Sequence, residues 1–271
     1  MNNITVIIPV HEFNEVISGY LDKAIESVQK QIGAEIPELI VVSGVNPDVN
    51  IFNYIADKNL PNCRFIRNDS GKSDYQSQVN FAVESVTTDY FTVLEFDDEL
   101  SGTYMKNANL YSTSYKDVDI FLSMIIEVNE KNEGIKLTNE TTWAQQFVGE
   151  NGEIGYLNVN ALKQYSDFKL SGAVIKKSEF INIGKYKSNI KLTFMYEFLL
   201  RALNNALKIY SIPKIGYKHL ATREDSLFDG YLKNMPISER KFWFETANNE
   251  CNFTNDRPIQ YLKIQDKTTE K

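Results

Sequence analysis

Apolar segments alternate with amphipathic ones through the first hundred residues, and this alternation limits the folds that are open to the chain. The first segment, ITVIIPV at residues 4–10, is a continuous β-branched run, typical of a strand covered on both faces. The same pattern predicts further strands and intervening helices, the strands at residues 38–44, 63–68 and 90–96 and the helices at 16–31, 50–58 and 73–85. Strands and helices in this order predict an α/β fold with a mostly parallel sheet flanked by helices.

The second part of the chain is less regular. It predicts strands at residues 117–128 and 170–175, a loop at 129–158 that carries Trp143 and Tyr156, helices at 192–207 and 238–251, and two short strands around Pro213 within 206–220. Because no linker rich in proline, glycine or serine separates the two parts, we expect a single domain over residues 1–255. Residues 256–271 are expected to form a polar tail.

A group of carboxylates follows the fourth predicted strand, in FTVLEFDDEL at residues 91–100. Parallel sheets bind ligands outside the carboxyl ends of their strands, so we expect a site there. Glu95 and Asp97 are two residues apart and would share a face of an extended strand, whereas Asp98 would point the other way unless the chain turns. The residues fit a divalent-cation site, and they also fit solvated acids or an N-cap for a helix beginning near Ser101.

Charge and composition exclude several classes of protein. A net charge of −7 over 271 residues argues against electrostatic binding of nucleic acid. No segment reaches the roughly 18 apolar residues of a membrane span, and the N-terminus lacks the basic region of a signal peptide. The two cysteines, Cys63 and Cys251, form no disulfide framework. We therefore expect a cytoplasmic protein, either free or peripheral to a membrane.

Four segments resemble, in order, the sequence blocks of family 2 glycosyltransferases. They are ITVIIPVHEFNE (4–15), NDSGKSDYQSQVNFAVESVTTDYFTVLEFDDEL (68–100), LSGAVIKKSEF (170–180) and LTFMYEFLLRALNNALKIYSIPKIGYKHLATREDSL (192–227). The resemblance implies the single-domain, Rossmann-like nucleotide-diphosphosugar transferase fold of the GT-A type. It also implies a nucleotide-binding lobe over residues 1–100, an acceptor lobe over 101–235 and a C-terminal helix over 236–255.

The resemblance implies an activity as well. Such an enzyme moves a sugar from a nucleotide-diphosphosugar, here expected to be a UDP-sugar, to a hydroxyl of a sugar, a glycolipid or a protein. Inversion at the anomeric carbon and dependence on Mn²⁺ or Mg²⁺ are carried over from the family. Two alternatives stay open, a sugar nucleotidyltransferase and a non-catalytic relative that binds sugar or nucleotide. The segment PVHEFNE counts against the first, because it has neither the glycine nor the basic residue of a nucleotidyltransferase loop.

The resemblance places the family's Asp-x-Asp motif on Glu95, Phe96 and Asp97, and the metal on Asp97 and His219. A half-buried histidine at a strand end is the alternative for His219. The donor-binding residues implied by the same matches are Pro9, Val10, His11, Ser43, Lys72, Gln78, Glu95, Phe96, Asp97, Gly172 and Arg223. Arg223 would clamp a phosphate, or else form a salt bridge with Glu224 or Asp225. Lys72 follows a glycine at a strand-to-helix junction that favours anions, but the full phosphate-loop pattern is absent. Asp74 is a further candidate for contact with the nucleoside.

Glu197 is the candidate general base, on the condition that it faces the cleft. The alternative is a surface pair with Arg201, one helical turn further on. Two positions depart from the family pattern. The usual Asp-Asp-Gly-Ser after the second strand is Val42-Ser43-Gly44-Val45, and the usual Glu-Asp pair on the late helix falls on Phe194-Met195.

Overall fold

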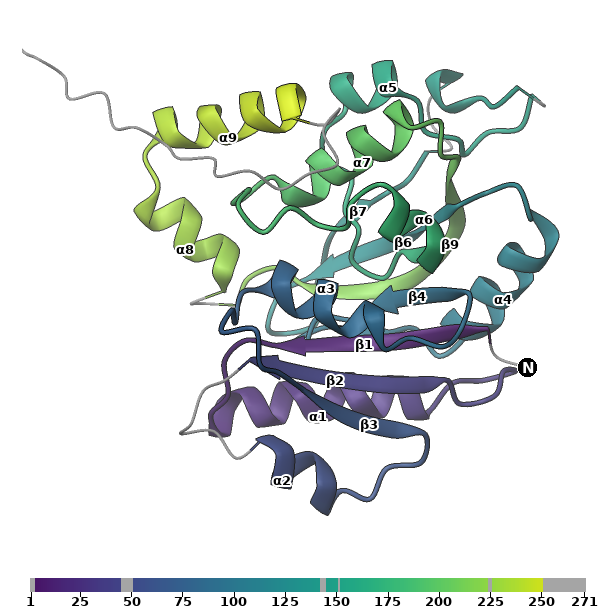
Figure 1. Cartoon of the computed structure of the whole chain (residues 1–271). Coiled ribbons are helices and arrows are strands. Elements are labelled where there is room, and N and C mark those ends of the chain that lie inside the picture. The colour runs from purple at the N-terminus through teal and green to yellow at the C-terminus, as the bar shows by residue number, and fades with distance from the viewer. Residues whose placement is uncertain (1–2, 45–50, 142–144, 151, 224–225, 251–271) are drawn as a thin grey trace, which may run out of the picture.

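The computed structural model describes residues 3–44, 51–141, 145–150, 152–223 and 226–250 (Figure 1). Trp143, Glu224, Asp225 and the tail over residues 256–271 lie outside these ranges. The described elements, in chain order, are β1 (Ile4–Val10), α1 (Glu15–Gln29), β2 (Glu38–Gly44), α2 (Ile51–Asp57), β3 (Cys63–Asn68), α3 (Tyr75–Glu84), β4 (Tyr90–Val93), β5 (Glu99–Leu100), α4 (Tyr104–Ser114), β6 (Ile120–Val128), β7 (Gly134–Thr138), the 3₁₀ helix η1 (Gln145–Phe147), α5 (Val159–Gln164), β8 (Val174–Lys176), α6 (Lys177–Asn182), α7 (Phe194–Asn204), β9 (Ile209–Leu220), α8 (Leu227–Asn234) and α9 (Ile237–Glu250).

Within the described residues the strands form one nine-stranded sheet. Its order is β3-β2-β1-β4-β8-β6-β9-β5, and β7 pairs with β6 off this path. β1 is parallel to β2 and β4, β2 is parallel to β3, and β6 is parallel to β9. β8 is antiparallel to both β4 and β6, so that β4, β6 and β9 run in the same direction. The predicted α/β fold with a mostly parallel sheet is confirmed.

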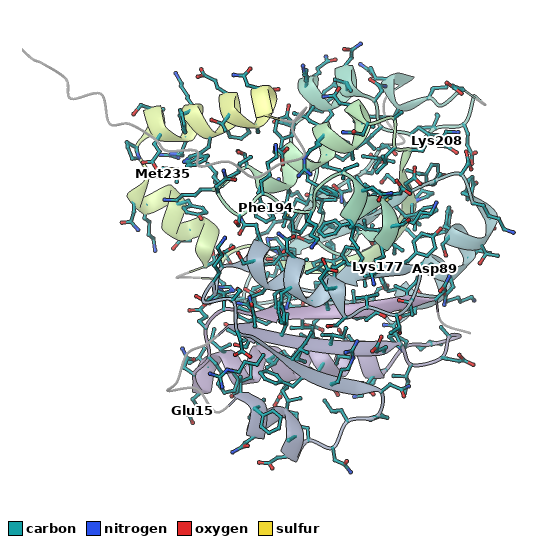
Figure 2. All side chains as sticks on the ribbon, viewed as in Figure 1. Glu15, Asp89, Lys177, Phe194, Lys208 and Met235 are labelled. Carbon is teal, nitrogen blue, oxygen red and sulfur yellow. The ribbon has the colours of Figure 1, made fainter. Side chains whose placement is uncertain are left out.

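Helices cover both faces of the sheet (Figure 1). Val79 of α3, Phe198 of α7 and Trp243 of α9 belong to the core on one face, and Leu21 of α1 and Met105 of α4 to the core on the other. Because neighbouring side chains of a strand point to opposite faces, β1 contributes alternately to the two cores. Figure 2 shows that side chains fill the space on both sides of the sheet.

The turn between β1 and α1 brings polar residues to the carboxyl end of the sheet. α1 begins at Glu15 because Asn14 caps it, its Oδ1 accepting the backbone N–H of Ile17 at 2.9 Å. The buried face of α1 follows helical spacing, with Ile17, Leu21, Ala24, Ile25 and Val28. His11 and Glu12 therefore lie in the short loop after the end of β1.

Four predicted elements differ from the structure. The strand predicted at residues 170–175 is β8, which begins only at Val174. The strand predicted at residues 90–96 ends at Val93, because the chain turns at the following acidic residues. The two short strands predicted around Pro213 are the single strand β9, whose register against β6 shifts between Ser123 and Ile125. This irregularity accommodates a proline, which has no N–H to donate to the ladder. The loop predicted over residues 129–158 contains β7 and η1.

Within the described ranges, every helix falls short of the length and apolarity that a membrane span requires.

Candidate active site

The chain turns directly after β4. The backbone N–H of Asp98 donates to the carbonyl oxygen of Glu95 at 3.1 Å, and the next residues form β5, which pairs with the end of β9. Glu99 lies opposite Lys218 in this pairing. The expectation that Glu95 and Asp97 share one face of an extended strand is therefore wrong. The turn instead brings Asp98 to the same side as Glu95.

Glu95, Asp98 and His219 meet at this turn, and one ligand-type atom from each lies within 4.8 Å of the other two. His219 Nδ1 is 3.0 Å from Asp98 Oδ2, and the backbone N–H of Leu220 donates to Asp98 Oδ1 at 2.8 Å. Ser171 Oγ donates to Glu95 Oε1 at 2.5 Å. Two carboxylates and an imidazole are a donor set that fits a divalent cation.

Burial and neighbouring charge shift the pKa values of this group. Burial raises the pKa of Glu95, and the charge of Asp98 raises it further. Burial lowers the pKa of His219, but the charge of Asp98 and its hydrogen bond outweigh burial and raise that pKa to about 9. His219 is thus protonated at neutral pH and forms an ion pair with Asp98. A cation that took His219 as a ligand would replace its proton.

Arg223 lies at the centre of a second charged cluster beside the first. Its Nε donates to Asp97 Oδ2 at 2.6 Å, and its Nη1 is 3.3 Å from Glu12 Oε1. The guanidinium lies over the ring of Phe96, 5.2 Å from the centroid, and the His11 ring lies 5.1 Å from the same ring. The arginine is only 8% exposed. It therefore joins the loop after β1, the acidic turn and the segment after β9.

Comparison with known protein families identifies the family of this chain. The sequence profile of glycosyl transferase family 2 matches residues 5–159, which is more than half of the chain. The chain belongs to this family. It is accordingly a glycosyltransferase, and the resemblance found in its sequence blocks is confirmed. Comparison with curated proteins found no match.

Solved structures of S. aureus TarS share the fold. Against TarS 1–349 the TM-score is 0.62 at 14% identity, with 92% of this chain and 80% of that chain covered. Against TarS 1–349 in complex with UDP-GlcNAc it is 0.63 at 13% identity, with 92% and 80% covered. Against a longer TarS structure it is 0.60 at 15% identity, and 93% of this chain covers 44% of that one. These likenesses confirm the GT-A fold.

The sequence predicted Asp97 and His219 as the metal ligands. In the structure the carboxylate beside His219 is that of Asp98. The carboxylate of Asp97 is directed to Arg223 instead. Burial, followed by the charge of Glu95, raises the pKa of Asp97, and Arg223 partly offsets this rise. Asp98 joins the group because the chain turns after Glu95, and the pairing of β5 with the later strand β9 fixes this turn.

The residues predicted at the ends of β1 and β2 lie next to one another. Pro9 and Val10 are buried within β1. Ser43 lies opposite Val10 in the sheet register, and its Oγ donates to the carbonyl oxygen of Val10 at 2.9 Å. Burial lowers the pKa of His11, and its Nδ1 is buried without a hydrogen-bond partner among the described residues. The donor-binding role of these residues stays a prediction.

The residues predicted near the start of α3 divide into exposed and structural ones. The side chain of Lys72 is exposed. Asp74 is the N-cap of α3 and accepts the backbone N–H of Ser77 at 2.9 Å. Gln78 is buried and donates to the carbonyl oxygen of Ser73 at 2.8 Å, which leaves its Oε1 unpartnered among the described residues. The N-cap of α3 is thus a structural role that accounts for an aspartate at position 74.

Glu197 does not meet the condition set for a general base. Its side chain is completely buried, its Oε1 accepts from Arg201 Nε at 2.8 Å, and Lys187 Nζ lies 3.2 Å from the same oxygen. Arg201 also donates to the backbone carbonyls of Ile183 and Lys185. The predicted partner Arg201 is confirmed, but the pair is internal rather than on the surface. The side chain of Glu197 cannot reach an acceptor in this arrangement.

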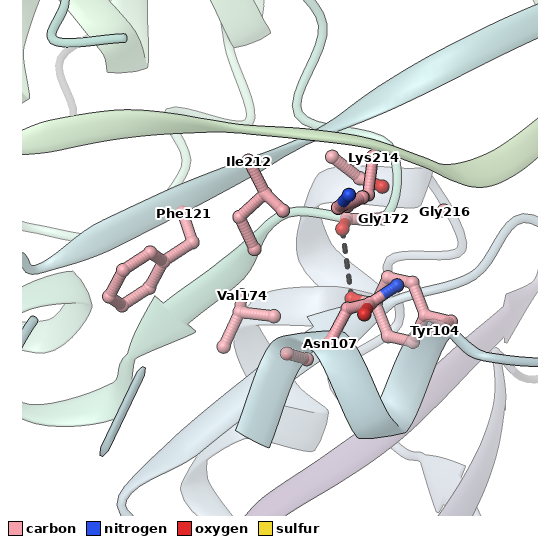
Figure 3. A pocket seen from close by; sticks show the side chains of 10 residues that line it. Tyr104, Asn107, Phe121, Gly172, Val174, Ile212, Lys214 and Gly216 are labelled. Atoms are coloured by element: carbon pink, nitrogen blue, oxygen red, sulfur yellow. Dashed lines mark hydrogen bonds between the residues drawn. The ribbon is translucent and has the colours of Figure 1, made fainter. Parts of the chain in front are cut away.

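Gly172 lies behind the acidic turn. A Cβ at this glycine, whose φ is +66°, would collide with the ring of Tyr217. Its carbonyl oxygen accepts the hydroxyl of Tyr104 at 2.9 Å, in a small pocket that Asn107, Val174 and Ile212 also line (Figure 3). Packing against Tyr217 therefore explains why this position needs a glycine. Contact of Gly172 with the donor sugar stays a prediction.

Sequence analysis missed Glu12, Ser171 and Tyr217. Glu12 stands directly after the predicted His11, and Ser171 directly before Gly172, so proximity to a motif was the available signal for both. Tyr217 carried no signal. The aromatic Tyr156 of the predicted loop packs edge-on against Tyr210 at 5.0 Å between ring centroids.

Proposed function

We infer that this glycosyltransferase moves a sugar from a UDP-sugar to an acceptor hydroxyl with inversion at the anomeric carbon, and that Mn²⁺ or Mg²⁺ binds to Glu95, Asp98 and His219. The observation that carries this proposal is the convergence of the three side chains at the acidic turn after β4. Ligands of α/β sheets bind outside the carboxyl ends of the strands, where this turn lies. The fold shared with TarS 1–349, solved with UDP-GlcNAc, supports a uridine nucleotide.

The chemistry needs positive charge at the diphosphate leaving group. A bound cation supplies that charge as the bond to the sugar breaks. The chain holds the proposed ligands in place in advance, because Ser171 fixes one oxygen of Glu95 and the backbone N–H of Leu220 fixes one oxygen of Asp98. Such supporting hydrogen bonds orient ligands and tune their affinity for metal.

Arg223 is the second source of positive charge in the proposal. Held between Asp97 and Glu12, it keeps guanidinium N–H groups that can donate to phosphate oxygens. The Phe96 ring beneath it limits the orientation of the guanidinium plane. We assign nucleoside and phosphate binding to His11, Ser43, Lys72 and Gln78, and to the backbone of Pro9 and Val10.

We further propose that residues 1–100 bind the donor and that residues 101–235, with the helix over 236–255, bind the acceptor. The acceptor supplies a hydroxyl on a sugar, a glycolipid or a protein. Inversion requires a base for the proton of that hydroxyl. Glu197 is not assigned this role, since its oxygens are engaged by Arg201 and Lys187 inside the protein.

Thermal unfolding with nucleotides tests the proposal. UDP, GDP, CMP and dTDP are each added with and without Mn²⁺, and we expect UDP with Mn²⁺ to raise the unfolding temperature most, because ligands that bind the folded state stabilise it. Asp98→Asn should remove the Mn²⁺-dependent part of the shift. Glu99→Gln is the matched control, since Glu99 lies on the same turn but pairs with Lys218, and it should keep the shift. A full Mn²⁺-dependent shift in Asp98→Asn would contradict the proposed site.

A further inference from the structure

The last residues of β9 hold the acidic turn at several atoms. Leu100 pairs with Tyr217 and Glu99 with Lys218 in the β5–β9 ladder. Beyond this ladder, His219 and the backbone N–H of Leu220 both contact the Asp98 carboxylate. The remaining contact comes from Tyr217, whose hydroxyl oxygen accepts the backbone N–H of Glu95 at 3.1 Å.

We propose that Tyr217 is a positioning residue for the metal site, holding Glu95 in place through its hydroxyl. The inference rests on the proposed function, because it concerns the same three ligands. The Tyr217 side chain is completely buried and lies behind the turn, so it acts through Glu95. No sequence motif pointed to it.

The hydroxyl supports the start of the turn. It satisfies the N–H of Glu95, which would otherwise lose its hydrogen-bond partner within the protein at a cost in free energy. The strand β9 therefore holds the first proposed ligand through the hydroxyl of Tyr217, and the second through His219 and the backbone N–H of Leu220.

The Tyr217 ring is itself held by the segment that carries Ser171. Gly172 leaves room for the ring, since a Cβ at this position would collide with it. The tyrosine hydroxyl thus has little freedom to move away from the turn.

Removal of the hydroxyl tests the inference. Tyr217→Phe keeps the ring in its place, and we expect the affinity for Mn²⁺ in the presence of UDP, measured by isothermal titration calorimetry, to fall about 10- to 100-fold, the range for residues that support metal ligands. Tyr104→Phe is the matched control. It too removes a buried tyrosine hydroxyl, but the hydrogen-bond partners of that hydroxyl are Thr92 and Gly172 rather than the turn. This variant should bind Mn²⁺ within about two-fold of the unsubstituted chain, since its proposed ligands are untouched.

The outcomes separate the inference from the proposed function. If the unsubstituted chain binds no Mn²⁺ with UDP, both are overturned. If it binds Mn²⁺ and Tyr217→Phe binds equally well, or if Tyr104→Phe loses as much affinity, the proposed function stands and the positioning role is overturned.

Circular dichroism shows whether each variant folds. Should Tyr217→Phe not fold, Gly172→Ala replaces it, because its Cβ displaces the ring while leaving the hydroxyl, and unchanged Mn²⁺ affinity there would overturn the inference.

Discussion

The buried ion pair of Glu197 and Arg201 ties α7 to the segment that follows α6. Arg201 donates to the backbone carbonyls of Ile183 and Lys185, and Lys187 approaches Glu197 from the same segment. Charges removed from water are stable only when they are paired and hydrogen-bonded. The carboxylate of Glu197 thus compensates two buried cations.

Glu197→Gln is predicted to lower the free energy of unfolding by about 3–5 kcal/mol, because it leaves Arg201 and Lys187 buried with incomplete compensation. Urea unfolding at pH 7 measures this change. The matched control is Glu84→Gln, whose carboxylate pairs with Lys185 but is 54% exposed, and which should cost less than about 1 kcal/mol. Equal effects of the two substitutions would contradict the account of this pair.

The sequence predicted the partner of Glu197 but not its surroundings. Four-residue spacing on a helix was enough to place Arg201 beside it. Burial of the pair depends on Lys187 and on the carbonyls near Ile183, which belong to a distant segment with no periodic signal. For the same reason Asp98 was passed over in favour of Asp97, since the turn at Glu95 is fixed by β9.

The pair of strands β6 and β7 is held by a charged cluster around Glu127. Its Oε1 accepts from Lys169 Nζ at 2.8 Å and from Thr138 Oγ1 of β7 at 2.7 Å, and Lys136 of β7 lies 3.6 Å away. Burial acts to raise the pKa of Glu127, but the hydrogen bonds from Lys169 and Thr138 outweigh it and lower the pKa. The cluster therefore stabilises the fold only while this carboxylate is ionised.

The contribution of the Glu127 cluster to the free energy of unfolding should therefore depend on pH. Because the pKa is lower in the folded state than in the unfolded state, the stabilisation is present above the unfolded value of about 4.3 and is lost as the pH falls through the folded value. Glu127→Gln should cost about 1–3 kcal/mol at pH 7, measured in urea, and the difference should narrow below about pH 4.3. The exposed Glu245→Gln is the control, and it should have little effect at any pH. A difference that grew towards acid pH would contradict the assignment.

Elements with a strong local pattern were predictable and those set by distant pairing were not. β1 and α1 follow from their own periodicity, and both lie within one residue of the predicted starts. β4 ends three residues early, because β5 has to turn back to reach β9. β9 is one strand rather than two, since an irregularity in its pairing with β6 absorbs Pro213.

Across the whole molecule, one sheet joins the predicted donor and acceptor lobes. β4 of the first hundred residues pairs with β8 of the later part, and β9 returns beside β6 to meet the acidic turn. This path brings His219 to Asp98, which stands 121 residues earlier in the chain. The candidate site is therefore complete only when both parts of the chain have folded.

The most direct test of the central claim is the anomalous scattering of manganese in a crystal grown with UDP and Mn²⁺. We predict a single strong anomalous peak at the acidic turn, within coordination distance of Glu95, Asp98 and His219, next to the diphosphate of UDP. A diphosphate bound at the edge of the sheet with no manganese at these three side chains, or with manganese held elsewhere, would contradict it.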